Sequence, residues 1–161
     1  MRIYGSNGTT FGAPASNARR TSSTGFSLPD ATETTETRST AAPKTVGNID
    51  ALASKRLYQV AIYTDNAGRP GTLVAVSVTG TLVANAWNTL GVSASLLPNT
   101  NYWLMFNTNG RTSSVNNMRF RNGNAGQGAY SRAAVLFGTW PATFPATTNS
   151  LVFSLFATFG Q

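Results

Sequence analysis

The feature that most constrains the fold is a series of short runs in which every second residue is apolar, each ended by turn-forming residues. In residues 57–63, Tyr58, Val60 and Ile62 share one face of an extended strand. The run ends at residues 64–71, where Asp, Asn, Gly and Pro supply turn geometry. Because such turns recur about every 8–12 residues and no helical apolar stripe is present, the sequence predicts an all-β fold.

The same alternation predicts the later strands. In residues 72–78 it places Val74, Val76 and Val78 on one face. A short strand of Met118 and Phe120 interleaves with two arginines. Further strands are expected at 82–83, 87–92, 102–106, around 130–137 and at 151–159. Together these runs predict a jelly-roll-like antiparallel β-sandwich.

The first 50 residues differ in composition from the rest. They are dominated by Gly, Ser, Thr, Ala and Asn, with few apolar anchors. Such a segment buries too little apolar area to offset the entropy cost of ordering its backbone. We therefore expect residues 1–50 to form an extended polar N-terminal arm and residues 51–161 to form the sandwich domain. A loose N-terminal tail is the alternative for residues 1–50.

The chain lacks most side chains that carry catalysis. It has no Cys and no His, which removes thiolate metal sites and the commonest general base at neutral pH. No carboxylate follows position 65, so acid pairs cannot be assembled in the predicted core. We therefore expect no enzyme activity, no cofactor and no metal site. The acidic residues are Asp30, Glu33, Glu36, Asp50 and Asp65.

The net charge of +7 results from few acids and not from many bases. The 12 Lys and Arg residues are scattered along the chain, whereas a nucleic-acid site usually shows clustered cations. A nucleic-acid partner is therefore not expected. No apolar stretch resembles a signal peptide or a membrane span, so we expect synthesis in the host cytoplasm without a signal peptide, exit from the cell only by lysis or assembly into a particle, and no membrane association.

Residues 58–73, with the sequence YQVAIYTDNAGRPGTL, resemble a recurrent hairpin in jelly-roll modules of phage virion proteins and bacterial surface proteins. Two further pieces fit that family in order, Trp87-Asn88-Thr89 and residues 97–104 with the sequence LPNTNYWL. The resemblance covers about residues 57–105. Within it the glycines, Pro70 and the aromatic residues are more readily explained as scaffold than as ligand contacts.

The resemblance implies a tailed-phage virion structural protein, specifically a capsid decoration or cement protein. Its partner would be the major capsid protein or another virion protein, and its location the virion. The alternative from another class is a carbohydrate-binding or receptor-binding module of a tail fibre or surface protein. That alternative would take a glycan and use an exposed aromatic side chain for stacking.

Three residues are candidates for surface ligand contact. Trp140 lies in a predicted loop, whereas Trp87 and Trp103 fall inside the family-like motifs and are expected in the core. Arg119 and Arg121 flank Phe120, which could form a base-stacking site. The simpler interpretation of this segment is a strand with Phe120 inward and both arginines outward.

Asp65 and Asn66 could contribute oxygen ligands to a calcium ion. With a single carboxylate nearby, an Asp-capped turn is the better interpretation.

The last predicted strand, 151–159, is apolar on both faces. Leu151, Phe153, Leu155, Ala157 and Phe159 would face one way, with Val152 and Phe156 on the other face. A strand of this kind is buried on both sides or covered by a partner. We therefore expect a homo-oligomer interface, in a trimer, formed by Leu151, Phe153, Phe156 and Phe159.

Overall fold

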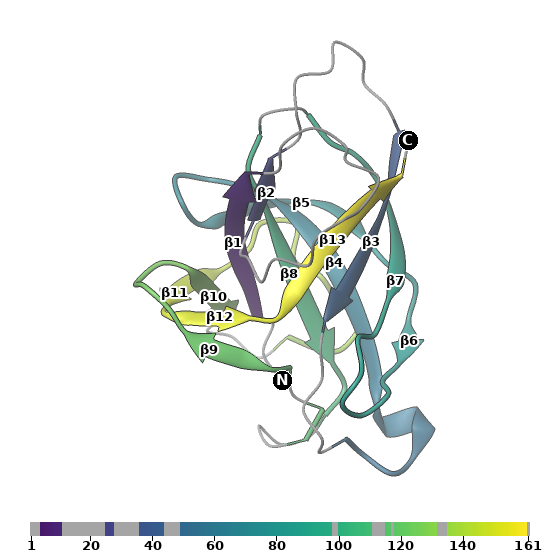
Figure 1. Ribbon diagram of the computed structural model, residues 1–161. Helices are drawn as coiled ribbons and strands as arrows, with labels where there is room; N and C mark the ends of the chain where they lie inside the picture. Colours follow the sequence, from purple (N-terminus) through teal and green to yellow (C-terminus); the bar gives the residue numbers. More distant parts are fainter. Residues whose placement is uncertain are drawn as a thin grey trace.

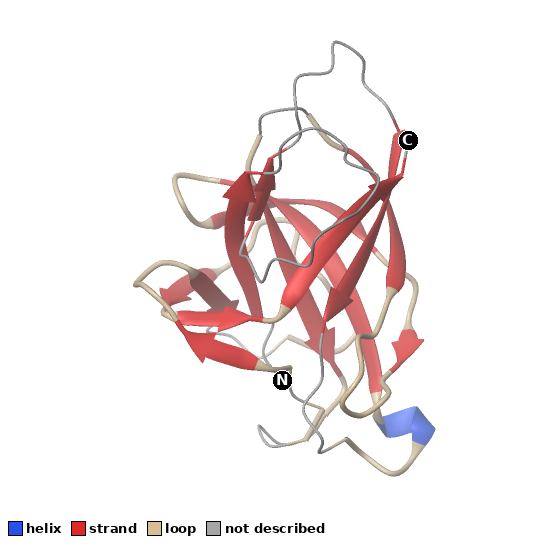
Figure 2. Cartoon of the chain, viewed as in Figure 1, coloured by secondary structure: helices blue, strands red, loops and turns tan. Residues whose placement is uncertain are grey.

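The computed structural model describes residues 4–10, 25–27, 36–43, 49–97, 100–110, 115–116, 118–131 and 135–160. Strands dominate these residues, and the one helical element among them is the short 3-10 helix η1 (Ala53–Lys55). The all-β prediction is confirmed (Figures 1 and 2). No helix in the described ranges is long and apolar enough to cross a membrane.

The largest sheet has eight strands and runs through the middle of the molecule (Figure 1). All its strand pairs are antiparallel except the pair of β1 and β2, which is parallel. Six strands follow one another across the sheet, while β2 pairs only with β1 and β6 only with β4. From one edge to the other, the order of these six strands is β11 (Ala146–Asn149), β10 (Gly128–Ser131), β1 (Tyr4–Thr10), β8 (Tyr102–Thr108), β4 (Leu57–Asp65) and β5 (Pro70–Val76). The two added strands are β2 (Gly25–Ser27) and β6 (Gly80–Thr81).

Two smaller sheets lie against the large one. The three-stranded sheet has the order β13 (Leu155–Gly160), β3 (Glu36–Pro43) and β7 (Leu90–Ser95). The two-stranded sheet pairs β12 (Leu151–Phe153) with β9 (Phe120–Asn122). Layered antiparallel sheets are therefore established, while the jelly-roll connectivity stays a prediction.

Strands from the N-terminal segment take part in both larger sheets. β1 lies between β8 and β10, and β3 lies between β13 and β7. Backbone pairing supplies these strands with hydrogen bonds that their own composition could not provide locally. The division into an arm of residues 1–50 and a domain of residues 51–161 stays a prediction, and it has to accommodate these two strands.

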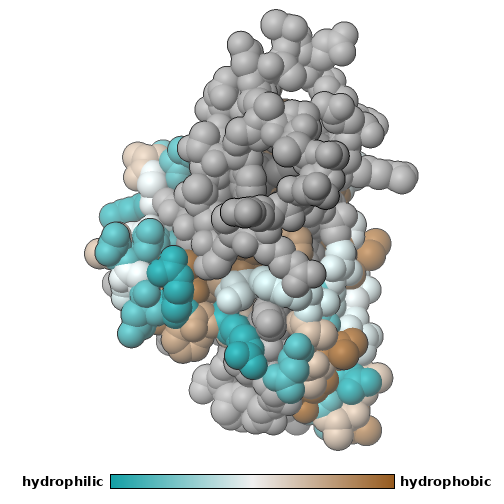
Figure 3. Space-filling view, in the orientation of Figure 1, coloured by the Kyte–Doolittle hydropathy of each residue, from teal (hydrophilic) through white to brown (hydrophobic). Residues whose placement is uncertain are grey.

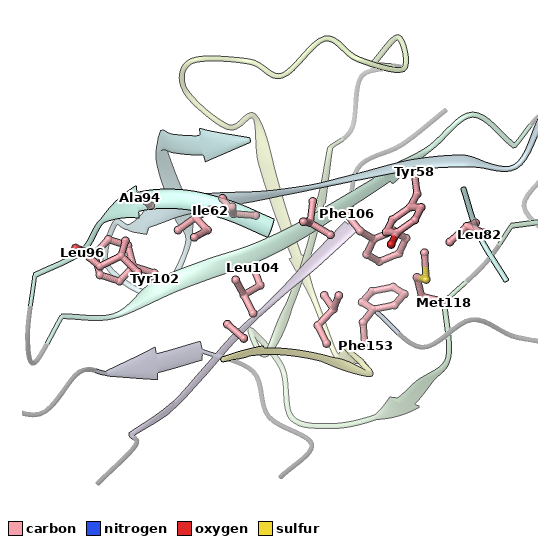
Figure 4. Packing of buried hydrophobic residues seen from close by; sticks show 14 residues of the cluster. Tyr58, Ile62, Leu82, Ala94, Leu96, Tyr102, Leu104, Phe106, Met118 and Phe153 are labelled. Atoms are coloured by element: carbon pink, nitrogen blue, oxygen red, sulfur yellow. The ribbon is translucent and has the colours of Figure 1, made fainter. Parts of the chain in front are cut away.

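The main core lies between the large sheet and the two smaller ones (Figure 4). β4 contributes Tyr58, Val60 and Ile62, as the alternation predicts. The alternate residues of β8 meet them from the neighbouring strand, and the smaller sheets close the core from the other side. This cluster comprises Tyr58, Val60, Ile62, Leu82, Val92, Ala94, Leu96, Tyr102, Leu104, Phe106, Met118, Phe153, Leu155 and Ala157.

A second, smaller core covers the opposite face of the large sheet. Its buried members include Tyr63 and Trp103, and residues from the segment 135–144 pack over them. The central strand β8 is therefore buried along its whole length, which explains why its sequence is almost continuously apolar. The members of the second core are Ala61, Tyr63, Trp103, Met105, Ala129 and Phe144, with Leu73, Val76, Val135 and Trp140 packed against them.

The predicted turn at residues 64–71 joins β4 to β5 in a tight hairpin. The Asn66 N–H donates to the Arg69 carbonyl at 2.7 Å, and the Arg69 N–H donates to the Asn66 carbonyl at 3.2 Å. Ala67 and Gly68 between them have φ values of 51° and 77°. Two positive φ values at the central positions define a type I′ turn, whose twist matches that of the flanking strands.

Several predicted strands differ from the observed ones. Residues 82–83 follow the strand β6 (Gly80–Thr81), β9 begins at Phe120 rather than Met118, and β10 spans Gly128–Ser131 rather than residues 130–137.

Val74, Val76 and Val78 do not share a face: Val74 contacts the main core, Val76 the second core, and Val78 is 74% exposed. The cause is a bulge, since Ile62 pairs with Ala75 while Tyr63 pairs with Leu73, leaving Val74 as the extra residue.

The run 151–159 forms two strands and not one, because Ser154 lies between β12 and β13 and the two strands join different sheets. The strand expected at 87–92 begins at Leu90 and continues to Ser95.

Candidate functional site

Packing against buried residues determines the positions of the tryptophan side chains. Trp103 is fully buried, and its indole N–H donates to Asp65 Oδ1 at 2.7 Å. Trp87 is half-buried, and its ring meets the Phe156 ring edge-on with centroids 4.8 Å apart. Both contacts are those of packing residues.

Trp140 lies in a loop, as predicted, but its side chain is turned toward the protein. Its indole N–H donates to Gln59 Oε1 at 3.0 Å, and its ring lies 6.3 Å from that of Tyr63. The indole also packs on the second core. Trp140 therefore covers part of the sheet and is not an open platform for stacking a ligand. Burying the apolar indole against the sheet face lowers the free energy of the fold more than exposing it to water would.

Asp65 caps the hairpin turn and also anchors Trp103. Asp65 Oδ2 accepts the Gly68 N–H at 3.0 Å, while Oδ1 accepts the Trp103 indole N–H. Both carboxylate oxygens thus have protein donors. Accepting the N–H of a residue three positions later is the geometry of an Asp-capped turn, which favours the turn interpretation of Asp65 and Asn66.

Two buried tyrosines have perturbed acidities. Burial raises the pKa of Tyr58 to about 12, because the charged phenolate is poorly solvated in the core. Burial also raises the pKa of Tyr63, whose hydroxyl donates to the Pro141 carbonyl at 2.8 Å. Raised pKa values keep both phenols neutral at physiological pH, so neither is a general base there.

Among the described residues, Asn107 of β8 is a fully buried side chain whose amide has no hydrogen-bond partner at either polar atom. It lies opposite Gln59 in the β4–β8 pairing. A buried unsatisfied amide costs about 1–3 kcal/mol, so Asn107 is a local weak point of the sheet.

One exposed feature is β9 together with the residue before it, which we call the β9 edge: Arg119, Phe120, Arg121 and Asn122. All four side chains are exposed, and Phe120 is 54% exposed. The prediction that Phe120 points inward is wrong, because Phe153 of β12 fills the core position opposite and leaves Phe120 at its rim. The Phe120 and Phe153 ring centroids are 5.8 Å apart.

The arginines of the β9 edge have few contacts within the chain. Arg119 makes a long, exposed contact of 3.5 Å from Nη2 to Asn85 Oδ1. Neither Arg119 nor Arg121 forms a salt bridge with a described residue. In Figure 3, hydrophilic residues gather on the side of the molecule where β9 to β12 lie. The β9 edge thus combines positive charge with one exposed aromatic ring.

The residues of the expected oligomer interface are placed differently from one another. Phe153 belongs to the main core and Leu151 packs against it, so neither offers a contact surface. Phe156 is half-buried and covered in part by Trp87. The side chain of Phe159 lies outside the described residues. Self-association through this strand stays a prediction.

Sequence reasoning named Arg119 and Arg121, but it preferred an inward Phe120 and did not include Asn122 among the candidates. Alternation indicates that neighbouring side chains face opposite ways, but not which face is buried when a strand has only three residues. The burial of Asn107 has only a weak signal in the sequence, which is the position of this amide directly after the apolar run 102–106.

These observations define a small all-β domain with two apolar cores and one basic, solvent-exposed strand edge. A family model described as class II flagellar assembly regulator (FliX) matches residues 1–60. The matched segment contains β1, β2 and β3 and the first residues of β4. Neither a curated protein nor a solved structure matches the chain.

This match overturns the interpretation as a phage jelly-roll module. The family that it matches is one of flagellar assembly regulators, not of decoration or cement proteins located in a virion. The carbohydrate-binding alternative is also unsupported, since Trp140 is engaged with Gln59. The hairpin motif of residues 58–73 was misleading because its residues specify a tight turn and a core, which unrelated proteins can share.

Proposed function

We propose that this chain takes part in the regulation of flagellar assembly in a bacterial cell, acting as a non-enzymatic protein-binding domain. The observation that carries the proposal is the match of residues 1–60 to the flagellar assembly regulator family. A regulator of assembly acts by binding other proteins, and the β domain offers a rigid scaffold for such contacts.

The organisation of the sheets supports a role for the matched segment within the folded domain. β1 pairs with β8 through Tyr4 to Asn7, and β3 pairs with β7 and β13. Changes in β1 or β3 would therefore alter the two larger sheets, whereas the exposed Lys55 of η1 lies outside both.

The proposed absence of enzyme activity is supported by the chemistry of the described residues. Asp65 is used by Trp103 and the hairpin turn, and burial raises the pKa of Tyr58 and of Tyr63. No paired acid and base, and no activated nucleophile, is assembled in the described part of the chain.

The test is deletion of the gene in the bacterium that encodes it, with complementation by the full-length chain. We expect the deletion strain to change flagellar number, counted by electron microscopy, and swimming in soft agar. Complementation should restore both. A deletion strain with normal flagella and normal swimming would reject the proposal.

A control separates function from folding. The exposed double variant Lys55→Glu/Arg69→Glu alters charge away from the β9 edge and should complement fully. A variant that unfolds the domain, assessed by circular dichroism of the purified chain, should not.

A further inference from the structure

We propose that the β9 edge binds an extended segment of a partner protein in which acidic and apolar residues alternate, adding it as a third strand beside β9. This inference rests on the proposed function: it names the kind of protein segment that such a regulator would bind. Strand addition uses backbone hydrogen bonds for affinity and alternate side chains for specificity.

The backbone of β9 is paired on one side only. The Ser154 N–H donates to the Arg119 carbonyl, and the Gly123 N–H donates to the Ser150 carbonyl, both at 2.7 Å. In an antiparallel pair, residues facing the partner strand alternate with residues facing away. Arg119, Arg121 and Gly123 therefore direct their backbone groups toward β12, and Phe120 and Asn122 direct theirs outward.

The outward groups have no acceptor or donor among the described residues. No backbone hydrogen bond within the described ranges involves the N–H or C=O of Phe120 or Asn122 on that side, and β9 pairs only with β12 in the described sheets. Two N–H and two C=O groups in a row form a template for another strand. This edge carries no proline and no bulge, and its protection against unspecific pairing consists of its short length and the charge of the two arginines, which an acidic partner strand would neutralise.

The side chains of the edge specify the chemistry of the partner. Arg119 and Arg121 lie on one face of the strand, and Phe120 and Asn122 lie on the other. An added strand with carboxylates on the arginine face and an apolar side chain beside Phe120 would complement both faces. A second copy of the chain fits poorly, since pairing β9 with β9 would bring the arginines of both copies together.

A single-stranded nucleic acid could use the arginines and the Phe120 ring, but it would leave the outward backbone groups without partners. The open backbone therefore favours a peptide. A nucleic acid is the competing outcome of the experiment.

The experiment measures binding of the full-length chain to a fluorescein-labelled peptide of alternating valine and glutamate by fluorescence anisotropy. A valine-lysine peptide and a single-stranded oligothymidylate serve as competing probes. We expect the glutamate peptide to bind, and the lysine peptide and oligothymidylate to bind at least about 10-fold more weakly.

Two variants test the two parts of the edge separately. Asn122→Pro removes an outward N–H without removing a β9–β12 bond, and should weaken peptide binding about 10-fold or more. Arg119→Glu/Arg121→Glu should abolish binding of the glutamate peptide. The matched charge control, Lys55→Glu/Arg69→Glu, makes the same charge change away from the edge and should retain most of the affinity.

Folding of each variant is checked by circular dichroism and thermal unfolding. Because Asn122→Pro could still disturb β9, Phe120→Ser gives a second measure, and we expect it to weaken binding through loss of apolar contact alone. Unchanged affinity in both Asn122→Pro and Phe120→Ser would overturn strand addition at this edge. Tighter binding of oligothymidylate than of the glutamate peptide would also overturn it.

The outcome is separable from that of the proposed function. If the deletion strain has altered flagella and the Asn122→Pro and Arg119→Glu/Arg121→Glu chains still complement, the β9 edge is not the binding surface although the function stands. If the peptide binds as expected and the deletion has no effect on flagella, the binding surface stands and the function fails.

Discussion

At the scale of single residues, Ala67 and Asn107 are two described positions where the native side chain conflicts with its surroundings. Ala67 adopts the left-handed conformation in the β4–β5 turn, with φ of 51°. Asn107 buries an amide without a hydrogen-bond partner. Both conflicts cost stability, and neither is linked to the β9 edge, so each can be relieved without altering the proposed binding surface.

Ala67→Asn should stabilise the protein. Asn tolerates positive φ better than Ala, and Asn-Gly is the preferred pair at the centre of a type I′ turn. We expect the free energy of unfolding to rise by about 0.5–1 kcal/mol in urea denaturation. The paired control is Gly68→Ala, which introduces a Cβ at φ of 77° and should lower stability. Equal stabilities of the two variants would contradict this account.

Asn107→Leu should also stabilise the protein, since it replaces an unsatisfied amide by an apolar side chain of similar size. We expect a gain of about 1–3 kcal/mol, the cost of the unpartnered group. The measurement is the urea midpoint at constant m-value. A loss of stability would show that the amide has a partner in solution, such as a bound water.

At the scale of elements, β10 and β12 approach each other closely at a glycine. A Cβ added to Gly128 would collide with the Leu151 carbonyl and with Asn149 Oδ1. By contrast, a Cβ added to Gly91 on the edge strand β7 would meet nothing within 4 Å. The chain thus leaves no room for a side chain at Gly128 and ample room for one at Gly91.

Gly128→Ala should destabilise the protein by about 1–3 kcal/mol or more, because the clash is with backbone and cannot be relieved by a side-chain rotation. Gly91→Ala should be neutral or stabilising by about 0.5–1 kcal/mol, since alanine loses less backbone entropy on folding. Thermal unfolding of the two variants provides the comparison. Similar melting temperatures would show that β10 and β12 are not held together as described.

At the scale of the whole molecule, the two cores share the large sheet. Tyr58 lies in the main core and Tyr63 in the second core, on opposite faces of β4. Both are acids whose neutral form is favoured by burial. Ionisation of either phenol therefore couples the stability of the whole domain to pH.

Stability should fall at alkaline pH. An unfolded tyrosine ionises near pH 10, whereas Tyr58 in the folded state has a pKa of about 12 and that of Tyr63 is also raised. Above pH 10 the unfolded state binds fewer protons, so the stabilisation is complete below pH 10 and is lost as pH rises toward about 12.

Urea unfolding between pH 8 and 12 checks this dependence. Tyr58→Phe and Tyr63→Phe should flatten it, and Tyr63→Phe also loses the hydrogen bond to the Pro141 carbonyl. An alkaline loss of stability that both phenylalanine variants retain would assign the effect to other groups.

The sequence by itself determined the strand character, the β4–β5 turn and the inward face of β4. These depend on period-two alternation and on local turn chemistry, so neighbouring residues are sufficient to predict them. Tertiary structure alone decided which long-range pairs form. It placed the bulge at Val74, turned Trp140 onto the second core and left Phe120 outside the main core.

The physical reason is that burial depends on what a strand meets across the sheet. Phe120 and Phe153 have the same side chain, yet Phe153 fills the core and Phe120 lies at its edge. That difference comes from what each ring meets in the main core: Phe153 packs edge-on against Phe106 of β8, with ring centroids 5.2 Å apart, and such long-range contacts are a property of tertiary packing rather than of local sequence.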